Sequence, residues 1–258
     1  MGTGFRFEAV SAEDYEELRP GYAAEAVAWV ADAAAIREGS LVVDLAAGTG
    51  QLACRFARYG ARVVAVEPAE NMRGVLAGRS PGLDVRDGRA EAIPLADDEA
   101  DAVVVGNAFH HFDAPAALAQ IRRVLRPGGT FAMFWARLDR DEAYPRYPGL
   151  EAIAAAVDAA VSAGGASAAI QQAYRTWSEA PPHADGFTSF ERRGFGLTHT
   201  LSSARLADLY ATSSNVASLD ASIRSELLDR VRELSSQLPE TLRLPAKTFV
   251  DRCRPEEA

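Results

Sequence analysis

Two acidic residues and a turn of small residues are spaced in this chain so that they could hold a nucleoside. Residues 42–50 read VVDLAAGTG, an apolar run containing Asp44 that passes into a small-residue turn. A second apolar run, residues 62–66, ends at Glu67. Small residues let the backbone approach a ligand closely, and a carboxylate at a strand end can accept both hydroxyls of a ribose. The spacing predicts a nucleoside cofactor across the edge of a parallel sheet.

The identity of the nucleoside is open on these residues alone. GTGQLA at residues 48–53, followed by Glu67, also fits the glycine pattern of nicotinamide dinucleotide sites, so an NAD-dependent oxidoreductase is an alternative. Asp44 argues against that alternative, because a dinucleotide site has no need of a charge inside its first strand. A carboxylate there could instead fix the glycine turn or receive an ammonium group.

Later blocks of sequence distinguish these alternatives. They read GRAEAIPL at residues 88–95, DAVVVGNAFHHF at 101–112 and RVLRPGG at 123–129. Together with the first turn they resemble the class I S-adenosylmethionine-dependent methyltransferases, in the small-molecule, type 11-like bacterial branch. The resemblance implies that S-adenosyl-L-methionine is the cofactor and that its methyl group passes to oxygen, nitrogen or carbon of a small organic molecule. An S-adenosylmethionine-binding protein with a non-methylating reaction is a further alternative, because fold does not fix function.

The chain departs from the usual family pattern at three places. Ala46 stands where many members have the first glycine of the turn, and Arg89 stands where many have Asp or Thr. FHHF stands where relatives usually show F-H-W-F. Arg89 cannot accept a hydrogen bond from the adenine amine, although backbone amides beside it could still bind a ring nitrogen.

The resemblance also implies a set of cofactor-binding residues. Asp44 would bind the cofactor ammonium or stabilise the loop, Glu91 would lie beside adenine or hold the start of a helix, and Arg19 would bind the cofactor carboxylate or form a surface ion pair with Glu16 or Glu17. We place Tyr15, Arg19 and Tyr22 before the first helix, closing over the cofactor. The full predicted set is Tyr15, Arg19, Tyr22, Asp44, Ala46, Gly48, Gly50, Glu67, Pro68, Arg89, Ala90, Glu91 and Asn107.

His110 and His111 are the candidate catalytic residues. Imidazole titrates near neutrality, so either could take a proton from an acceptor hydroxyl or amine. The alternative is that the pair packs against the cofactor, and at most one of two adjacent residues at a strand-to-helix corner is expected to face the substrate. We expect no metal site, because two adjacent histidines with scattered acids do not form a ligand set.

Alternating strands and helices predict an α/β fold, a Rossmann-like doubly wound sheet. The family resemblance implies seven mainly parallel strands that end in an antiparallel pair. The remaining helices are more than that sheet requires, so we assign them to a helical cap over the substrate. Residues 1–258 are interpreted as a single methyltransferase domain. Its core is expected at about 36–136, 187–201 and 246–254, and its cap at about 1–30, 137–186 and 202–240.

Composition and net charge limit the classes of partner that the chain is expected to bind. Its 258 residues carry a net charge of −9, which argues against a nucleic-acid substrate because phosphate contacts dominate such binding. No apolar run is long enough to cross a bilayer, and the N-terminus lacks the basic start and apolar centre of a secretory signal. We therefore expect a cytoplasmic protein with a small-molecule substrate and no membrane or nucleic-acid partner. Its oligomeric state is left open.

Overall fold

A seven-stranded sheet organises the chain in the computed structural model, which describes residues 10–163 and 168–256. The strand order is β3-β2-β1-β4-β5-β7-β6. Strands β1 to β5 run parallel, whereas β7 is antiparallel to β5 and β6 is antiparallel to β7. The strands are β1 (Leu41–Leu45), β2 (Arg62–Val66), β3 (Asp84–Arg86), β4 (Ala100–Gly106), β5 (Leu125–Leu138), β6 (Glu191–Ser202) and β7 (Thr241–Cys253). The predicted fold class is confirmed.

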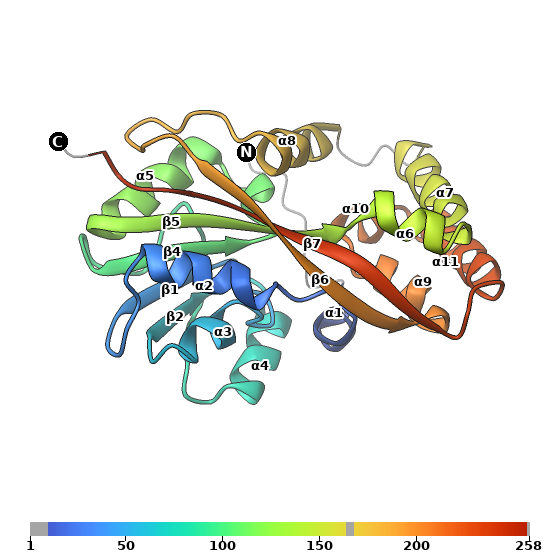
Figure 1. Cartoon of the computed structure of the whole chain (residues 1–258), viewed down its shortest axis with the longest axis horizontal. Helices are drawn as coiled ribbons and strands as arrows, with labels where there is room; N and C mark the ends of the chain where they lie inside the picture. Colours follow the sequence, from blue (N-terminus) through green and yellow to red (C-terminus); the bar gives the residue numbers. More distant parts are fainter. Residues whose placement is uncertain (1–9, 164–167, 257–258) are drawn as a thin grey trace.

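Helices cover both faces of this sheet, as Figure 1 shows. One face packs against α2 (Ala24–Ala33), α3 (Ala53–Ala57) and α4 (Glu70–Arg79). The other packs against α5 (Ala114–Val124), the short 3-10 helix η2 (Phe109–His111) and α8 (Ala168–Glu179). Strand β1 is buried along its whole length, which explains its unbroken apolar run.

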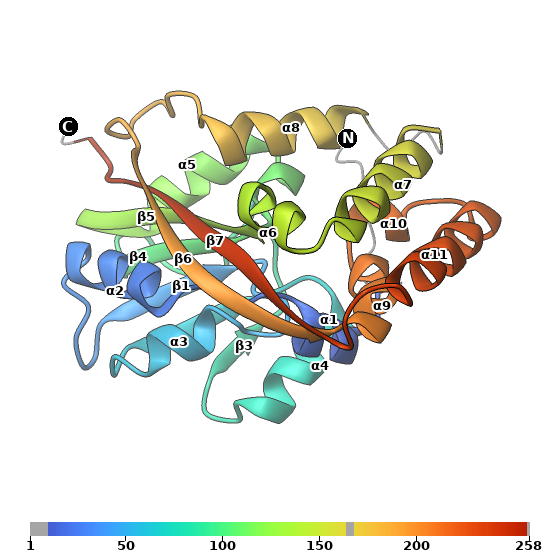
Figure 2. The same cartoon turned by 45° about the vertical axis from the view of Figure 1, so that its right-hand side comes forward.

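The cap lies beyond the carboxyl end of β5, at the right-hand end of the molecule in Figures 1 and 2. Its own apolar core joins helices from three separate segments to the ends of β6 and β7. The helices are α1 (Ala12–Leu18), α6 (Arg140–Arg146), α7 (Gly149–Ala163), α9 (Leu206–Ala211), α10 (Ser214–Ala217) and α11 (Ala221–Ser235). A 3-10 turn, η3 (Ser203–Arg205), leads from β6 into α9.

The structure departs from the expected cap in two places. Helix α2 lies on the sheet, because Ala26, Val27 and Val30 are buried against strand residues. The expectation that residues up to 30 belong to the cap is therefore wrong for α2. Helix α8 also covers a sheet face, since Trp177 packs into the apolar core on that side.

The antiparallel pair is longer than its apolar pattern indicated. Strand β7 pairs with β6 from Thr241 onward, whereas its pairing with β5 begins only at Ala246. The extra residues form a two-stranded ribbon beyond the main sheet. Leu242 and Leu244 on this ribbon are buried in the cap core. The ribbon thus joins the sheet to the cap.

Candidate functional site

The candidate site lies where the strand order reverses direction. Strand β1 has β2 on one side and β4 on the other, so the connections after them leave toward opposite faces. In open α/β sheets, ligands bind in the crevice outside the carboxyl ends of the strands at such a point. The loops after β1, β2 and β4 carry most of the predicted site residues.

The turn after β1 follows a left-handed backbone path. Ala46, Gly48 and Gly50 have φ angles of +51°, +57° and +89°. A Cβ at Gly50 would overlap the side chain of Leu76 on α4, so this position needs glycine for packing as well as for conformation. Ala46 adopts the same region with a side chain, at a cost of about 1–2 kcal/mol. The substitution noted in the sequence therefore leaves the turn in place.

Glu67 ties the turn after β1 to the end of β2. One carboxylate oxygen accepts a hydrogen bond from the Gly48 backbone N–H at 2.8 Å, and the other accepts from the Ala69 N–H at 2.8 Å. Burial raises the pKa of Glu67, against the lowering effect of these two hydrogen bonds. A carboxylate has about four acceptor positions, so it can hold the two loops and still receive a ribose hydroxyl.

Asp44 is buried beneath the same turn, with 1 % of its surface exposed. Its Oδ2 accepts from the Ala53 backbone N–H at 2.9 Å, which fixes the start of α3. Burial raises the pKa of Asp44 to about 8, and the nearby Glu67 adds to the shift. The loop-stabilising role is thus observed. The ammonium-binding role stays a prediction, and a positive charge beside Asp44 would relieve the cost of ionising it.

Asn107 closes the site at the end of β4. Its backbone N–H donates to the Phe134 carbonyl at 2.8 Å, and its side-chain oxygen accepts from the Ala136 N–H at 2.9 Å. Its amide nitrogen donates to the hydroxyl of Tyr22 at 3.3 Å. The side chain therefore joins the ends of β4 and β5 to the segment between α1 and α2. A Cβ at Gly106 would overlap the Tyr22 hydroxyl, so this contact requires glycine.

Two tyrosines cover the space between these groups. Tyr15 lies within α1 rather than before the first helix as expected, and Tyr22 follows that helix. Burial raises the pKa of both phenols. Beneath them a cavity of about 20 Å³ is lined by Tyr15, Tyr22, Asp44, Gly48, Leu52 and Gly106. Ligand pockets usually measure about 300–1,000 Å³, so the cavity is nearly closed in this conformation.

Arg19 is held by the cap. Its Nε donates to the Thr212 hydroxyl at 2.9 Å, and its guanidinium lies 5.3 Å from the centre of the Tyr15 ring. Glu16 pairs with Arg79 and Glu17 with Arg205. The alternative of an ion pair between Arg19 and either acid is therefore not found in the described part of the chain. Its role toward the cofactor carboxylate stays a prediction.

The predicted adenine region lies after β3. Arg89 is exposed and pairs with Ala92 in an isolated bridge, whereas Ala90 is buried. Glu91 accepts from the backbone N–H of Asp113 at 2.9 Å, just before α5. This is the helix-start role that the sequence left open for Glu91. Pro68 is exposed after Glu67, and its carbonyl accepts from Arg73 at 2.7 Å.

His110 and His111 lie in η2 with their ring centres 3.9 Å apart. His110 packs edge-on against Tyr174 of α8, and its Nδ1 is buried without a hydrogen-bond partner. Burial lowers the pKa of His110 to about 2, with His111 adding to the shift. Burial likewise lowers the pKa of His111 to about 4. Both imidazoles are therefore neutral at physiological pH, and taking up a proton would be costly in this environment.

Sequence reasoning missed several residues of this site. Trp135 lies near His110 at the end of β5, and a large aromatic residue at a strand end was a usable signal. Glu16 and Tyr174 reach the site from helices whose placement the sequence does not reveal. Within the described residues, no group of three or more His, Cys, Asp or Glu side chains could hold a metal ion. No described helix is long and apolar enough to cross a membrane.

Comparisons with known proteins agree on the family. A family profile described as a methyltransferase domain matches residues 43–133. An uncharacterised methyltransferase of Mycobacterium tuberculosis (strain H37Rv) is 36 % identical over 225 residues, covering 87 % of this chain and 84 % of the relative.

Solved structures share the fold at lower identity. A candidate type II methyltransferase of Anaeromyxobacter dehalogenans has a TM-score of 0.67 at 21 % identity, covering 92 % of this chain and 98 % of the other. The cyclase SpnF has a TM-score of 0.50 at 14 % identity, covering 91 % and 82 %. With the profile match and the mycobacterial relative, the chain belongs to the class I S-adenosylmethionine-dependent methyltransferases.

Proposed function

We propose that this chain transfers the methyl group of S-adenosylmethionine to a small organic molecule bound between the strand ends and the cap. The observation that carries the proposal is the pair of buried carboxylates, Asp44 and Glu67, on either side of a left-handed glycine turn. A nucleoside that also bears an ammonium group needs acceptors of this kind at its two ends.

Each part of the cofactor has a suitable partner. Glu67 would accept the ribose hydroxyls, and the backbone at Gly48 would approach the ligand without a side chain in the way. Asp44 would face the ammonium, and Asn107 the methionine portion. Backbone amides around Ala90 would bind the adenine ring, since the exposed Arg89 offers no acceptor.

The protein's task in this reaction is positioning. The cofactor supplies an activated methyl group and a neutral leaving group, so alignment of the two partners and exclusion of water account for most of the catalysis. Asn107 fixes the ends of β4 and β5 beside the reacting region. The depressed pKa values of His110 and His111 favour packing over proton abstraction.

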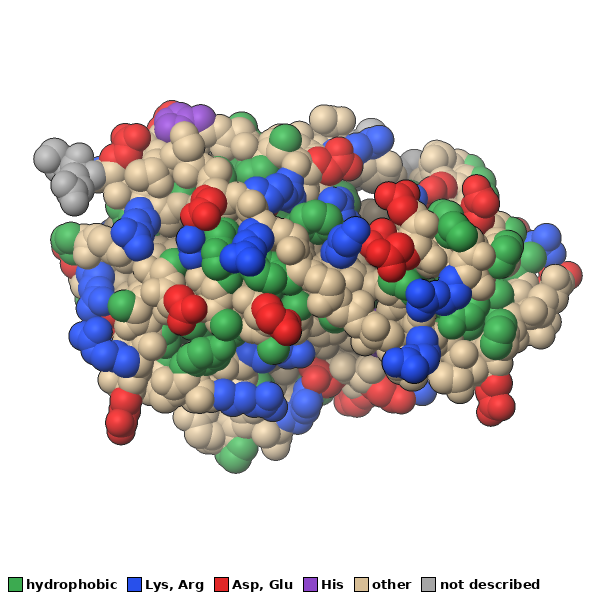
Figure 3. Space-filling model, viewed as in Figure 1, with side chains coloured by type: hydrophobic (Ala, Val, Ile, Leu, Met, Phe, Trp, Pro, Cys, Tyr) green, Lys and Arg blue, Asp and Glu red, His purple; other side chains and the backbone are tan. Residues whose placement is uncertain are grey.

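A small acceptor is favoured over a nucleic acid. Acidic and basic side chains are interspersed over the face in Figure 3, and the net charge is −9. A strand of nucleic acid would need a continuous basic surface. We further propose a bacterial cytoplasm as the location, supported by the mycobacterial relative and by the free thiols of Cys54 and Cys253, which are typical of a reducing compartment.

Calorimetry with S-adenosylhomocysteine and NAD, each against the purified chain, tests the cofactor. Binding of S-adenosylhomocysteine without a response to NAD supports the proposal, and the reverse result overturns it. Incubation with methyl-deuterated S-adenosylmethionine and a panel of phenols, amines and enolisable ketones then tests the reaction. A fold shared with a cyclase leaves other chemistry open. Cofactor binding without label transfer to any acceptor would therefore favour the non-methylating alternative.

A further inference from the structure

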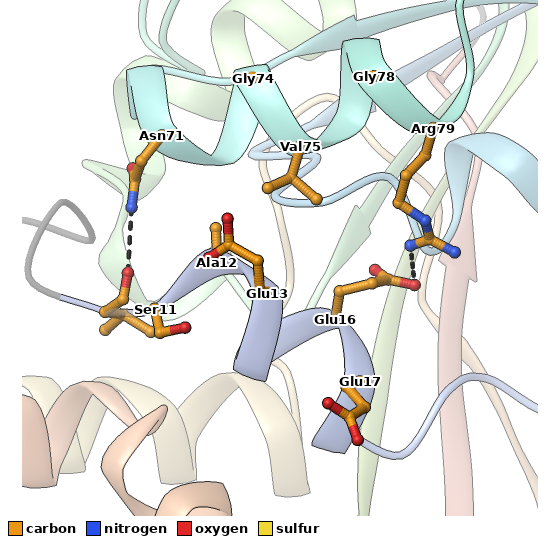
Figure 4. Close-up of a pocket in the computed structure, with 11 residues that line it drawn as sticks. Ser11, Ala12, Glu13, Glu16, Glu17, Asn71, Gly74, Val75, Gly78 and Arg79 are labelled. Carbon is orange, nitrogen blue, oxygen red and sulfur yellow. Dashed lines mark hydrogen bonds and ion pairs between the residues drawn. The ribbon is translucent and has the colours of Figure 1, made fainter.

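The charges around the molecule decide where a charged acceptor can bind. A groove of about 900 Å³ between α1 and α4 has an acidic wall, because Glu13, Glu16 and Glu17 line it from α1, as Figure 4 shows. Arg79 also lines this groove, but it pairs with Glu16. The groove therefore repels anions. Positive charge without a partner lies elsewhere, at the end of β5.

The carboxyl end of β5 places Arg137 beside the reacting region. Arg137 follows Ala136, whose backbone N–H donates to the side chain of Asn107 at 2.9 Å. Asn107 is the residue that we place beside the methionine portion of the cofactor. Because side chains alternate along a strand, Arg137 and Trp135 point to the same face of the sheet, the face that η2 and α8 cover. Arg137 therefore lies at the strand ends where the proposed acceptor binds.

Arg137 stands opposite a second cation. In the register of β5 and β7 it is paired with Lys247, and like charges directly opposite each other destabilise a sheet. The next residue in this row is Gly196 of β6. Apart from its chain neighbours, no heavy atom lies within 4 Å of a Cβ built on Gly196. The row thus carries two positive charges and ends in open space.

The buried acids near this row are paired with other cations. Asp139 pairs with Lys247 at 2.6 Å, and Asp251 pairs with Arg192 at 3.4 Å. Within residues 10–163 and 168–256, Arg137 has no ion-pair partner. Three cations thus share two buried acids, and Arg137 is the one left over. The other acids that influence these cations are exposed, namely Asp141, Glu142 and Glu179.

The N–H groups of the Arg137 guanidinium are available to a ligand. The group lies 4.4 Å from the centre of the Phe249 ring, which holds it in place by a cation–π contact. In the part of the chain that the structure describes, the Arg137 side chain donates no hydrogen bond. A carboxylate can accept two parallel hydrogen bonds from such a group. Because Arg137 is half-buried, water screens this attraction less than at an exposed site.

We propose that Arg137 is a specificity-determining residue that binds a carboxylate of the methyl acceptor. The inference rests on the proposed function, because it assumes that the acceptor binds at the ends of β4 and β5. It narrows the small organic molecule to the carboxylic acids. Since the whole chain carries a net charge of −9, an anionic acceptor needs local positive charge in order to bind.

The carboxylate stays in the ion pair during the reaction. Another nucleophilic group of the acceptor forms the bond to the methyl carbon. The bond between that carbon and sulfur breaks, and its electron pair stays on the sulfur of S-adenosylhomocysteine. The proton of the acceptor group passes to water, because both neighbouring imidazoles take up protons only at low pH.

The test compares carboxylic acids with their amides, which have nearly the same shape but no charge. The probes are 4-hydroxybenzoate and hexanoate, each with its primary amide, titrated at pH 7 into the chain saturated with S-adenosylhomocysteine. Calorimetry measures each Kd. We expect the parent chain to bind at least one acid about tenfold or more tightly than its amide, as a hydrogen-bonded charge pair does. Arg137→Gln should lose this preference.

Matched variants separate the role of Arg137 from a general effect of charge. Arg193→Gln removes the same charge from the other face of the sheet, where Arg193 lies 5.1 Å from the Phe195 ring, and should keep the preference. Arg137→Lys keeps the charge without the planar group and should keep part of the preference. If Arg137→Gln does not fold, Gly196→Asp places an internal carboxylate in the same row and should weaken binding of the acids alone.

Two results overturn the role of Arg137. One is a parent chain that binds neither acid more tightly than its amide. The other is an Arg137→Gln protein that keeps the preference of the parent, because Arg137 would then only pack over Phe249. If the parent chain does not bind S-adenosylhomocysteine, the proposed function itself fails. If it binds S-adenosylhomocysteine but does not prefer the acids, only the role of Arg137 fails.

Discussion

Glu67 already accepts two backbone N–H groups, so a ribose must share it with the loops that it ties. We predict that Glu67→Ala weakens binding of S-adenosylhomocysteine by about 1–3 kcal/mol, the usual cost of buried polar groups left unpaired. Calorimetry measures this loss. Asp87→Ala is the matched control, since Asp87 is an exposed carboxylate that pairs with Arg73. Unchanged affinity in a folded Glu67→Ala protein would remove the ribose role.

Asp44 should couple cofactor binding to proton release. Its pKa of about 8 in the free protein means that it is mostly protonated at pH 7. A bound ammonium group lowers that pKa by charge attraction, against the raising effect of burial and of the nearby Glu67. Binding at pH 7 should therefore release up to about one proton. Calorimetry in buffers of different ionisation enthalpy measures this release.

The same shift has a consequence for stability. A carboxyl group whose pKa is higher in the folded chain favours folding when protonated. The Asp44 contribution should therefore be lost as the pH rises from about 4 to about 8. Asp44→Asn should remove both the proton release and this part of the pH dependence. Binding heats that do not depend on the buffer in the parent chain would contradict the assignment.

His110 and His111 should not appear in the pH profile of turnover. Their pKa values of about 2 and about 4 place imidazole titration below the working range. We expect His110→Gln and His111→Gln to lower cofactor affinity and Tm together, because the rings pack among aromatic side chains. A turnover loss of about 10²-fold at unchanged affinity would instead identify a general base.

At the scale of the elements, the end of β4 requires a glycine, which has no side chain. Gly106→Ala introduces a Cβ that overlaps the Tyr22 hydroxyl and disturbs its bond with Asn107. We expect a loss of about 1–3 kcal/mol in the free energy of unfolding, measured by urea denaturation. Gly196→Ala on β6 has open space at its Cβ and should cost far less. Adding Tyr22→Phe to Gly106→Ala should restore part of the lost free energy of unfolding, because it removes the overlapping hydroxyl. If the double variant is no more stable than Gly106→Ala alone, the strain arises from another contact.

The sequence predicts those elements whose own residues show the pattern of their burial. The two apolar runs noted in the sequence coincide with strands β1 and β2, because buried parallel strands appear as continuous apolar runs. Helix α1 was missed because only Ala12 and Leu18 are buried, and its partners Thr49, Arg79 and Arg205 lie far away in the chain. Helix α6 was missed because it contains Pro145.

In the candidate site, too, some features follow from local sequence and others depend on residues that are distant in the chain. Its acids and glycines were identified from their types and spacing. Which atoms Glu67 and Glu91 bind depends on loops brought together by folding, so their backbone partners could not be predicted. The shifted pKa values of Asp44 and His110 are consequences of burial, which no local pattern specifies.

On the scale of the molecule, α1 is also connected to the cap. Arg205 beside α9 bonds Asp14 at 2.6 Å and Glu17 at 3.2 Å, and Arg19 donates to Thr212 at 2.9 Å. We expect S-adenosylhomocysteine to slow hydrogen exchange in α1 and α9 more than in α2, which already packs on the sheet. Mass spectrometry of peptides from each helix measures this difference. Slowing confined to the sheet would contradict it.

The β6–β7 ribbon has a consequence for how such a protein can be altered. Ser202 and Thr241 are paired across the two strands, so the chain leaves β6 and returns to β7 at the same place. Everything between them, including α9, α10 and α11, is therefore a single insertion in a hairpin. An insertion with adjacent ends can be exchanged for another without changing the register of the strands below it. The part of the cap made by α9, α10 and α11 could in this way be exchanged as one continuous piece of sequence, while α1, α6 and α7 and the cofactor-binding sheet stay the same.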